Sequence, residues 1–172
     1  MNLYNKYYVP IIVGCYILGC IMSISFCDDN MISFHRDKSS VSFYDFLPFD
    51  RFAFIAKNNL IVAIRYVIFS ILTFGIGSLL YSFYNGLIFG FVVLKGAKIL
   101  TISEIAGCTL PHAITEMVGL SMAGYIGLVL SYSIFASRKI ATFKKVINLS
   151  LFTLILIILS SILESYVSMD SN

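Results

Sequence analysis

The chain has few charged residues, and it has no hydrophilic stretch long enough to form a soluble domain. Only 12% of its 172 residues are Asp, Glu, Lys or Arg, whereas 59% are hydrophobic, and the mean hydropathy is +0.90. Soluble domains carry about 25% charged residues. The composition therefore excludes a soluble protein and predicts an all-α, polytopic integral membrane protein made of a transmembrane helical bundle.

Motifs of several other protein classes are also missing. Basic residues are not interleaved with aromatic ones in a patch, so nucleic acid is not expected as a partner. The sequence has no HExxH motif and no Glu-Glu pair, and we expect no cofactor and no metal ion. Cys15, Cys20 and Cys108 lie in apolar runs, which indicates packing rather than disulfide bonds.

Apolar runs long enough to cross a membrane fill most of the chain. The hydrocarbon core of a bilayer is ~30 Å thick, so a helical span needs ~20 apolar residues. Residues 1–172 are predicted to form a single integral membrane domain that interacts with the lipid bilayer. The predicted segments are an uncleaved first span at 7–27, a hydrophilic or interfacial loop at 28–58, spans at 59–81, 82–100 and 111–135, and a last span at 146–167.

The second half of the 28–58 loop is aromatic, and it has two interpretations. Asp50 can cap a short helix that places Phe52, Ile55 and Asn59 on one face, which predicts an interfacial helix leading into the second span. Alternatively, the segment is a loop whose rings lie among the lipid headgroups.

Residues 101–110 are too few to cross the membrane, and they include Glu104. Pro111 suits the first turn of a helix, and Thr109 before it can act as the cap. The sequence therefore predicts five to six spans, with a broken or re-entrant segment before Pro111.

The distribution of Lys and Arg bears on the choice between five and six spans. Five crossings place five of these residues on one side and six on the other: Lys6, Arg138, Lys139, Lys144 and Lys145 against Arg36, Lys38, Arg51, Lys57, Lys95 and Lys98. Six crossings divide the same residues 1 against 10, which is the asymmetry that membrane proteins normally show. Both topologies, and the orientation, stay open at this point.

Two ionisable residues follow Pro111 within an apolar run. His112 and Glu116 are one helical turn apart and therefore share a face. Small residues continue this stripe, which predicts that the face packs against other helices rather than lipid. The predicted helix-packing residues are Gly86, Gly90, Pro111, Gly119, Ala123 and Gly127.

Polar groups in a membrane interior are costly unless they find partners, so we expect the polar residues of different spans to meet. Asn58 and Asn59 are expected to open the second span, and Asn85 the third. The predicted buried polar cluster consists of His112, Glu116, Asn58, Asn59, Asn85 and Glu104.

Four short motifs resemble the stage II sporulation protein M family. They are Phe54-Ile55-Ala56-Lys57-Asn58-Asn59, Asn85-Gly86 with Phe89-Gly90, Leu110-Pro111-His112 with Glu116, and Ala123-Gly124 to Gly127. The resemblance covers roughly residues 50–135 and indicates a family-like core at 59–135. It departs from the family at Ala113, where Gly is usual.

The resemblance implies a non-enzymatic subunit or scaffold of a multiprotein envelope complex in the bacterial cytoplasmic membrane. The namesake of the family acts with a peptidoglycan hydrolase during engulfment of the forespore, which implies a cell-wall hydrolase complex as the partner. Compact relatives accompany circular bacteriocins, which implies an alternative partner in an ABC transporter or other bacteriocin machinery, with a role in maturation, export or immunity. Homo-oligomerisation is a further option.

Three hypotheses follow for His112 and Glu116. The pair can hold the fold of a scaffold, or it can line a pathway for a peptide, an ion or a proton. It can also supply two ligands of an intramembrane metallohydrolase, for which only His35 and Glu104 are available as a third ligand. The first hypothesis is preferred, because the pair shares the small-residue stripe.

Overall fold

Five long helices make up the computed structural model, which describes residues 2–26, 48–98, 100–135 and 143–167. They are α1 (Asn2–Phe26), α2 (Pro48–Leu72), α3 (Ile76–Gly96), α4 (Ile102–Phe135) and α5 (Phe143–Val167). Each helix contains a stretch that is long and apolar enough to cross a membrane, and no strand occurs within these ranges. The predicted all-α, polytopic bundle is confirmed, with five spans.

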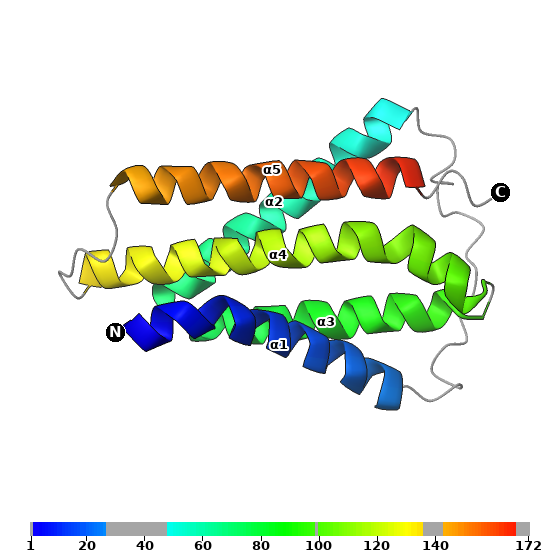
Figure 1. Cartoon of the computed structure of the whole chain (residues 1–172), viewed down its shortest axis with the longest axis horizontal. Coiled ribbons are helices and arrows are strands. Elements are labelled where there is room, and N and C mark those ends of the chain that lie inside the picture. The colour runs from blue at the N-terminus through cyan, green and yellow to red at the C-terminus, as the bar shows by residue number, and fades with distance from the viewer. Residues whose placement is uncertain (1, 27–47, 99, 136–142, 168–172) are drawn as a thin grey trace.

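The helices are arranged around α4, which contacts all four of the others. Figure 1 shows α1 beside α3, α5 beside α4, and α2 crossing the bundle at an angle. Successive helices alternate in direction, so α1 begins at one end of the bundle and α5 finishes at the other. With five crossings, the start of α1 and the end of α5 therefore lie on opposite sides of the membrane.

The predicted boundary between the second and third spans, at 81/82, is wrong. The chain turns at Thr73 to Gly75, between α2 and α3. Gly75 has φ 97°, a left-handed conformation that glycine adopts without steric cost, and the Thr73 hydroxyl accepts a 2.6 Å hydrogen bond from the Gly77 N–H. Local turn chemistry therefore overrides an apolar run that continues through the turn.

The observed helix bounds place four of the predicted residues in helix interiors. Asn85 and Gly86 lie in the middle of α3 rather than at its start. Asn58 and Asn59 lie inside α2, because α2 already begins at Pro48 and includes the expected interfacial helix after Asp50. Residues 28–47 of the predicted loop lie outside the described residues.

The broken or re-entrant segment predicted before Pro111 is also wrong, and so is the six-span topology. α4 is one helix of 34 residues that contains Pro111 in its interior. Its start is fixed by a capping box: the Thr101 N–H donates to Glu104 Oε2 at 2.7 Å, and the Glu104 N–H donates to Thr101 Oγ1 at 3.4 Å. Thr109 is therefore not a cap.

The length of α4 explains how residues 102–110 are accommodated. At ~1.5 Å per residue, 34 residues extend about 51 Å, which exceeds the ~30 Å hydrocarbon core. Figure 1 shows the N-terminal part of α4 bending toward α3, and a proline in a helix interior is a common cause of such a bend. The bend keeps the excess length against the bundle.

The interior of the bundle is rich in small hydroxyl side chains, and its exterior is rich in large apolar ones. Leu80 and Ile155, for example, are more than 60% exposed. A surface of this kind is suited to lipid, while small residues allow helices to approach one another. The buried serines are Ser70, Ser78, Ser82, Ser121, Ser131, Ser160, Ser161 and Ser165.

Candidate functional site

The helix α4 is linked to α5 near Pro111 through a backbone carbonyl, that of His112. Pro111 has no N–H, so the carbonyl of Gly107 lacks its usual helical donor. The next residue, His112, places its ring Nδ1 3.1 Å from the Cys108 carbonyl oxygen, to which the Nδ1–H tautomer donates. Ser160 on α5 donates to the His112 carbonyl at 3.1 Å. His112 therefore contributes its ring to its own helix and its carbonyl to the contact with α5.

Glu116 lies one turn after His112 and is partly buried. Its carboxylate interacts electrostatically with Glu164 on α5, and it lies within electrostatic range of Tyr16 on α1 and Tyr66 on α2. The structure thus brings Glu116 toward a second carboxylate, and that carboxylate is Glu164 rather than the predicted Glu104.

Glu164 was not among the residues that the sequence predicted for the buried polar cluster. It is only partly exposed. The sequence did hold a signal, because the small residues Ser160, Ser161 and Ser165 follow a helical spacing that includes position 164. The structure buries all three.

The predicted asparagines contact different neighbours. The Asn59 amide is buried and donates to Ser161 Oγ on α5 at 3.4 Å. The Asn85 amide donates to the Tyr66 hydroxyl at 3.2 Å and so joins α3 to α2. Each amide therefore stabilises a separate helix pair.

Asn58 and Glu104 do not belong to the interior, and this part of the predicted cluster is wrong. Both are exposed. Asn58 is rotated by ~100° from Asn59 around α2, so the two amides cannot face the same neighbour. Glu104 caps the start of α4, two turns before His112 and on the far side of the Pro111 bend.

The predicted packing glycines lie at helix contacts, and those of α3 meet α1. A Cβ atom added at Gly86 would overlap the Tyr16 carbonyl oxygen, and one at Gly90 would lie 2.7 Å from the Cys20 carbonyl oxygen. Gly19, which the sequence reasoning missed, faces the backbone of α3 at Phe83. The spacing of small residues at positions 15, 19 and 23 could have indicated it.

The small residues of α4 face several different helices rather than one. A Cβ atom at Gly119 would lie 3.3 Å from Leu156 Cβ on α5, whereas one at Gly127 would lie 2.5 Å from the Val67 carbonyl oxygen on α2. Ala123 lies between them and is 1% exposed. The stripe therefore turns from α5 toward α2 along the length of α4.

A buried hydrogen-bond network that the sequence did not indicate joins four helices near the α2–α3 turn. Tyr8 of α1 is 1% exposed, and its hydroxyl donates to the Gly75 carbonyl at 2.7 Å and lies 2.5 Å from Ser78 Oγ of α3. Ser70 of α2 lies 3.4 Å from the same hydroxyl and donates to the Gly124 carbonyl of α4 at 2.7 Å. No local pattern marks Tyr8, because its partners are more than 60 residues away.

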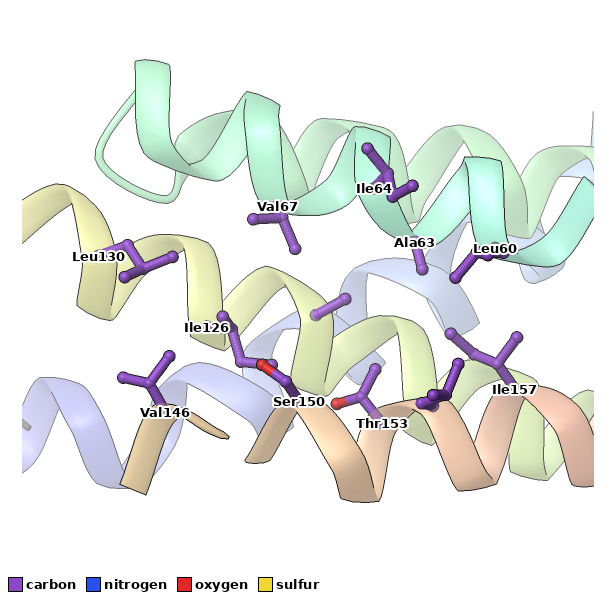
Figure 2. A pocket seen from close by; sticks show the side chains of 12 residues that line it. Leu60, Ala63, Ile64, Val67, Ile126, Leu130, Val146, Ser150, Thr153 and Ile157 are labelled. Carbon is purple, nitrogen blue, oxygen red and sulfur yellow. The ribbon is translucent and has the colours of Figure 1, made fainter. Parts of the chain in front are cut away.

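Apolar hollows also lie between the described helices. One, of about 350 Å³, lies between α2, α4 and α5 (Figure 2), and another, of about 290 Å³, lies between α1, α3 and the start of α4. Within the described ranges, no three His, Cys, Asp or Glu side chains are grouped so that they could hold a metal ion. His35 lies outside those ranges.

One family model matches the chain. No curated protein and no solved structure shows a match. The family model described as stage II sporulation protein M matches residues 8–169, which extends well beyond the motifs at 50–135 and includes nearly the whole helical bundle. Since the match covers most of the 172 residues, this multi-pass membrane protein belongs to the stage II sporulation protein M family.

Proposed function

We propose that the protein is a non-enzymatic subunit or scaffold of a multiprotein complex in the bacterial cytoplasmic membrane. The name of the family supports a role in sporulation, and we infer a complex with a cell-wall hydrolase during engulfment or cell-wall remodelling. The family match extends over all five helices. The membrane bundle itself is therefore the part of the molecule that we expect to carry the function.

The observation that carries this proposal is the use of polar groups as links between helices. The Tyr8 network joins four helices, Asn59 links α2 to α5, and the His112 carbonyl links α4 to α5. The His112 ring hydrogen bonds to its own helix. These polar groups therefore hold the helices of the chain together, and a scaffold requires such a stable bundle. Interhelical hydrogen bonds in membranes contribute roughly 0.6–2 kcal/mol each.

Affinity purification from the producing cells in mild detergent tests the proposal. We expect the full chain to co-purify with membrane proteins, including a cell-wall hydrolase. Ser160→Ala, which removes the α5 donor to the His112 carbonyl, should lower the yield of the complex and the melting temperature of the isolated chain together. Leu80→Ala, on the lipid-facing side of α3, is the control and should leave the complex intact.

Two outcomes would contradict this assignment. Loss of biological function in His112→Ala with complex yield and melting temperature unchanged would show that His112 does more than hold the fold. Recovery of an ABC transporter or other bacteriocin machinery in place of a hydrolase would assign the complex to bacteriocin maturation, export or immunity.

Proton handling is a second candidate, and one observation favours it. Glu116 on α4 interacts electrostatically with Glu164 on α5, and ionisable side chains inside a membrane are a common feature of proton pathways. The test is the decay of an imposed pH gradient across phospholipid vesicles that contain the purified complex. A proton pathway requires faster decay than in empty vesicles and loss of that decay in Glu116→Gln, and vesicles as tight as empty ones would exclude it.

A further inference from the structure

The hollow between α2, α4 and α5 is a crevice in the side of the bundle. α2 and α5 both pack against α4, and they diverge from each other where α4 forms the floor (Figures 1 and 2). Leu60 and Ile64 of α2 and Leu154 of α5 line the crevice and are 39–49% exposed, so it opens toward the lipid. Its volume of about 350 Å³ is within the range of ligand pockets.

One polar atom in this apolar crevice has no partner. Thr153 of α5 lines the crevice (Figure 2) and is 6% exposed, and its hydroxyl oxygen is buried without a hydrogen bond to any described residue. A buried hydroxyl without a partner costs about 1–3 kcal/mol. Other buried hydroxyls of α5, those of Ser160, Ser161 and Ser165, do have acceptors within the bundle. Thr153 is thus set apart from its neighbours.

The depth of Thr153 restricts what can satisfy its hydroxyl. It lies ten residues after Phe143 and fourteen before Val167, which corresponds to ~15 Å and ~21 Å along α5. A hydrocarbon core ~30 Å thick therefore covers it on both sides. Lipid ester and headgroup atoms lie at the edges of this core, and an acyl chain carries no donor or acceptor. A lipid tail can fill the crevice, but it leaves the hydroxyl unpaired.

We propose that this crevice binds a transmembrane helix of a partner protein, and that rotation of the Thr153 side chain about χ1 turns its buried hydroxyl toward a hydroxyl or amide side chain of that helix. A helix is the occupant that brings both apolar bulk and a hydrogen-bonding group to the middle of a membrane. Ser150, one turn before Thr153, also lines the crevice and offers a second hydroxyl to the same partner. This inference rests on the proposed function, because it names the face through which the scaffold holds a partner.

Site-specific photo-crosslinking of the full chain in its producing cells tests the proposal. A photoreactive amino acid is placed at Ile64 or Leu154 on the two rims of the crevice, and at Leu80 or Leu18 as lipid-facing controls on α3 and α1. We expect both rim positions to crosslink to the same protein, and the controls to react with lipid alone.

Substitutions at Thr153 make the test specific to its hydroxyl. Thr153→Val keeps the shape of the side chain and should reduce the protein crosslink at least threefold, whereas Thr153→Ser keeps the hydroxyl and should retain it. The melting temperature of the isolated chain should stay unchanged or rise in Thr153→Val, because no internal hydrogen bond is lost. A lower melting temperature would show that Thr153 has an internal structural role and would overturn the proposal.

Other outcomes also decide the matter. Lipid adducts alone at both rims, a crosslink between two copies of this chain, or equal crosslinks in Thr153→Val and the unchanged protein would each overturn the proposal. If membrane partners still co-purify in any of these cases, the docking face is wrong and the proposed function stands. If no protein co-purifies with the unchanged chain, the proposed function itself fails.

Discussion

The contact between α1 and α3 differs from the contacts that α5 makes with α2 and α4. At the first, Gly19, Gly86 and Gly90 bring two backbones together so closely that added Cβ atoms would meet main-chain atoms. The Ser82 hydroxyl also donates to the Ile12 carbonyl at 2.9 Å across this contact. At the second, a Cβ atom added at Gly119 would lie 3.3–3.4 Å from side-chain atoms of α5, and a crevice of about 350 Å³ stays open between α2 and α5.

The difference indicates that the two sides of the bundle have different roles. Backbone contact through glycine leaves no room for adjustment, and at this contact the Ser82 hydroxyl has a partner in the chain. Side-chain contact can adjust by small rotations, and the α5 side retains one hydroxyl that has none within the described ranges. We infer that the α1–α3 pair holds the fold, whereas the α2–α5 side is available for a partner.

Gly86→Ala should have the largest effect of the changes that test this comparison. Its Cβ atom would overlap the Tyr16 carbonyl, so the helices must separate. We expect a loss of about 3 kcal/mol in unfolding free energy, measured by thermal unfolding in detergent. Gly14→Ala is the matched control in α1, because its Cβ would meet no atom within 4 Å. Equal melting temperatures for the two variants would show that the α1–α3 contact is not tight.

Tyr8→Phe should have the next largest effect. It removes the hydroxyl that donates to the Gly75 carbonyl and contacts Ser78, so we expect a loss of about 1–2 kcal/mol in the same unfolding measurement. Tyr84→Phe is the control, because Tyr84 is 54% exposed and its ring contact with Tyr81 does not need the hydroxyl. If Tyr8→Phe is as stable as this control, the hydrogen bonds of the Tyr8 hydroxyl do not stabilise the fold.

Gly119→Ala should have the smallest effect, and it sharpens the comparison. The added Cβ would lie 3.3 Å from Leu156 Cβ and 3.4 Å from Ile157 Cγ1, which are side-chain atoms that can shift. The strain is offset by the better helix propensity of alanine, worth about 1 kcal/mol, so we expect the stability to change by less than about 1 kcal/mol. A loss as large as that of Gly86→Ala would mean that the α4–α5 contact is equally rigid.

Much of the fold could be predicted from the sequence, but the candidate site could be predicted only in part. The apolar runs indicated the helices, and the motifs around Asn58, Gly86 and His112 indicated the family. The turn at Gly75 was missed because the residues on both sides of it are apolar. The capping box of Thr101 and Glu104 was present in the sequence and was overlooked, because Pro111 offered a competing helix start.

The partners of the polar residues could not be predicted by position along the chain. The sequence predicted that six polar residues form one buried cluster. In the structure, however, Asn85 contacts Tyr66 and Asn59 contacts Ser161, so the two amides have separate partners. Tyr8 is buried and Glu164 is partly buried, and the sequence predicted neither position. Periodicity shows which face of a helix is polar, but it does not show which other helix that face meets.

The sequence by itself determined that this is a membrane protein of the stage II sporulation protein M family, since hydropathy and motif spacing are local properties of the chain. Only the tertiary structure decided that five helices cross, that Glu116 interacts electrostatically with Glu164, and that Thr153 lies unpaired in an open crevice. These features depend on how helices cross, and contacting residues such as Asn59 and Ser161 are 102 positions apart in the sequence. Crossing geometry arises from the packing of all five helices together, which no single segment encodes.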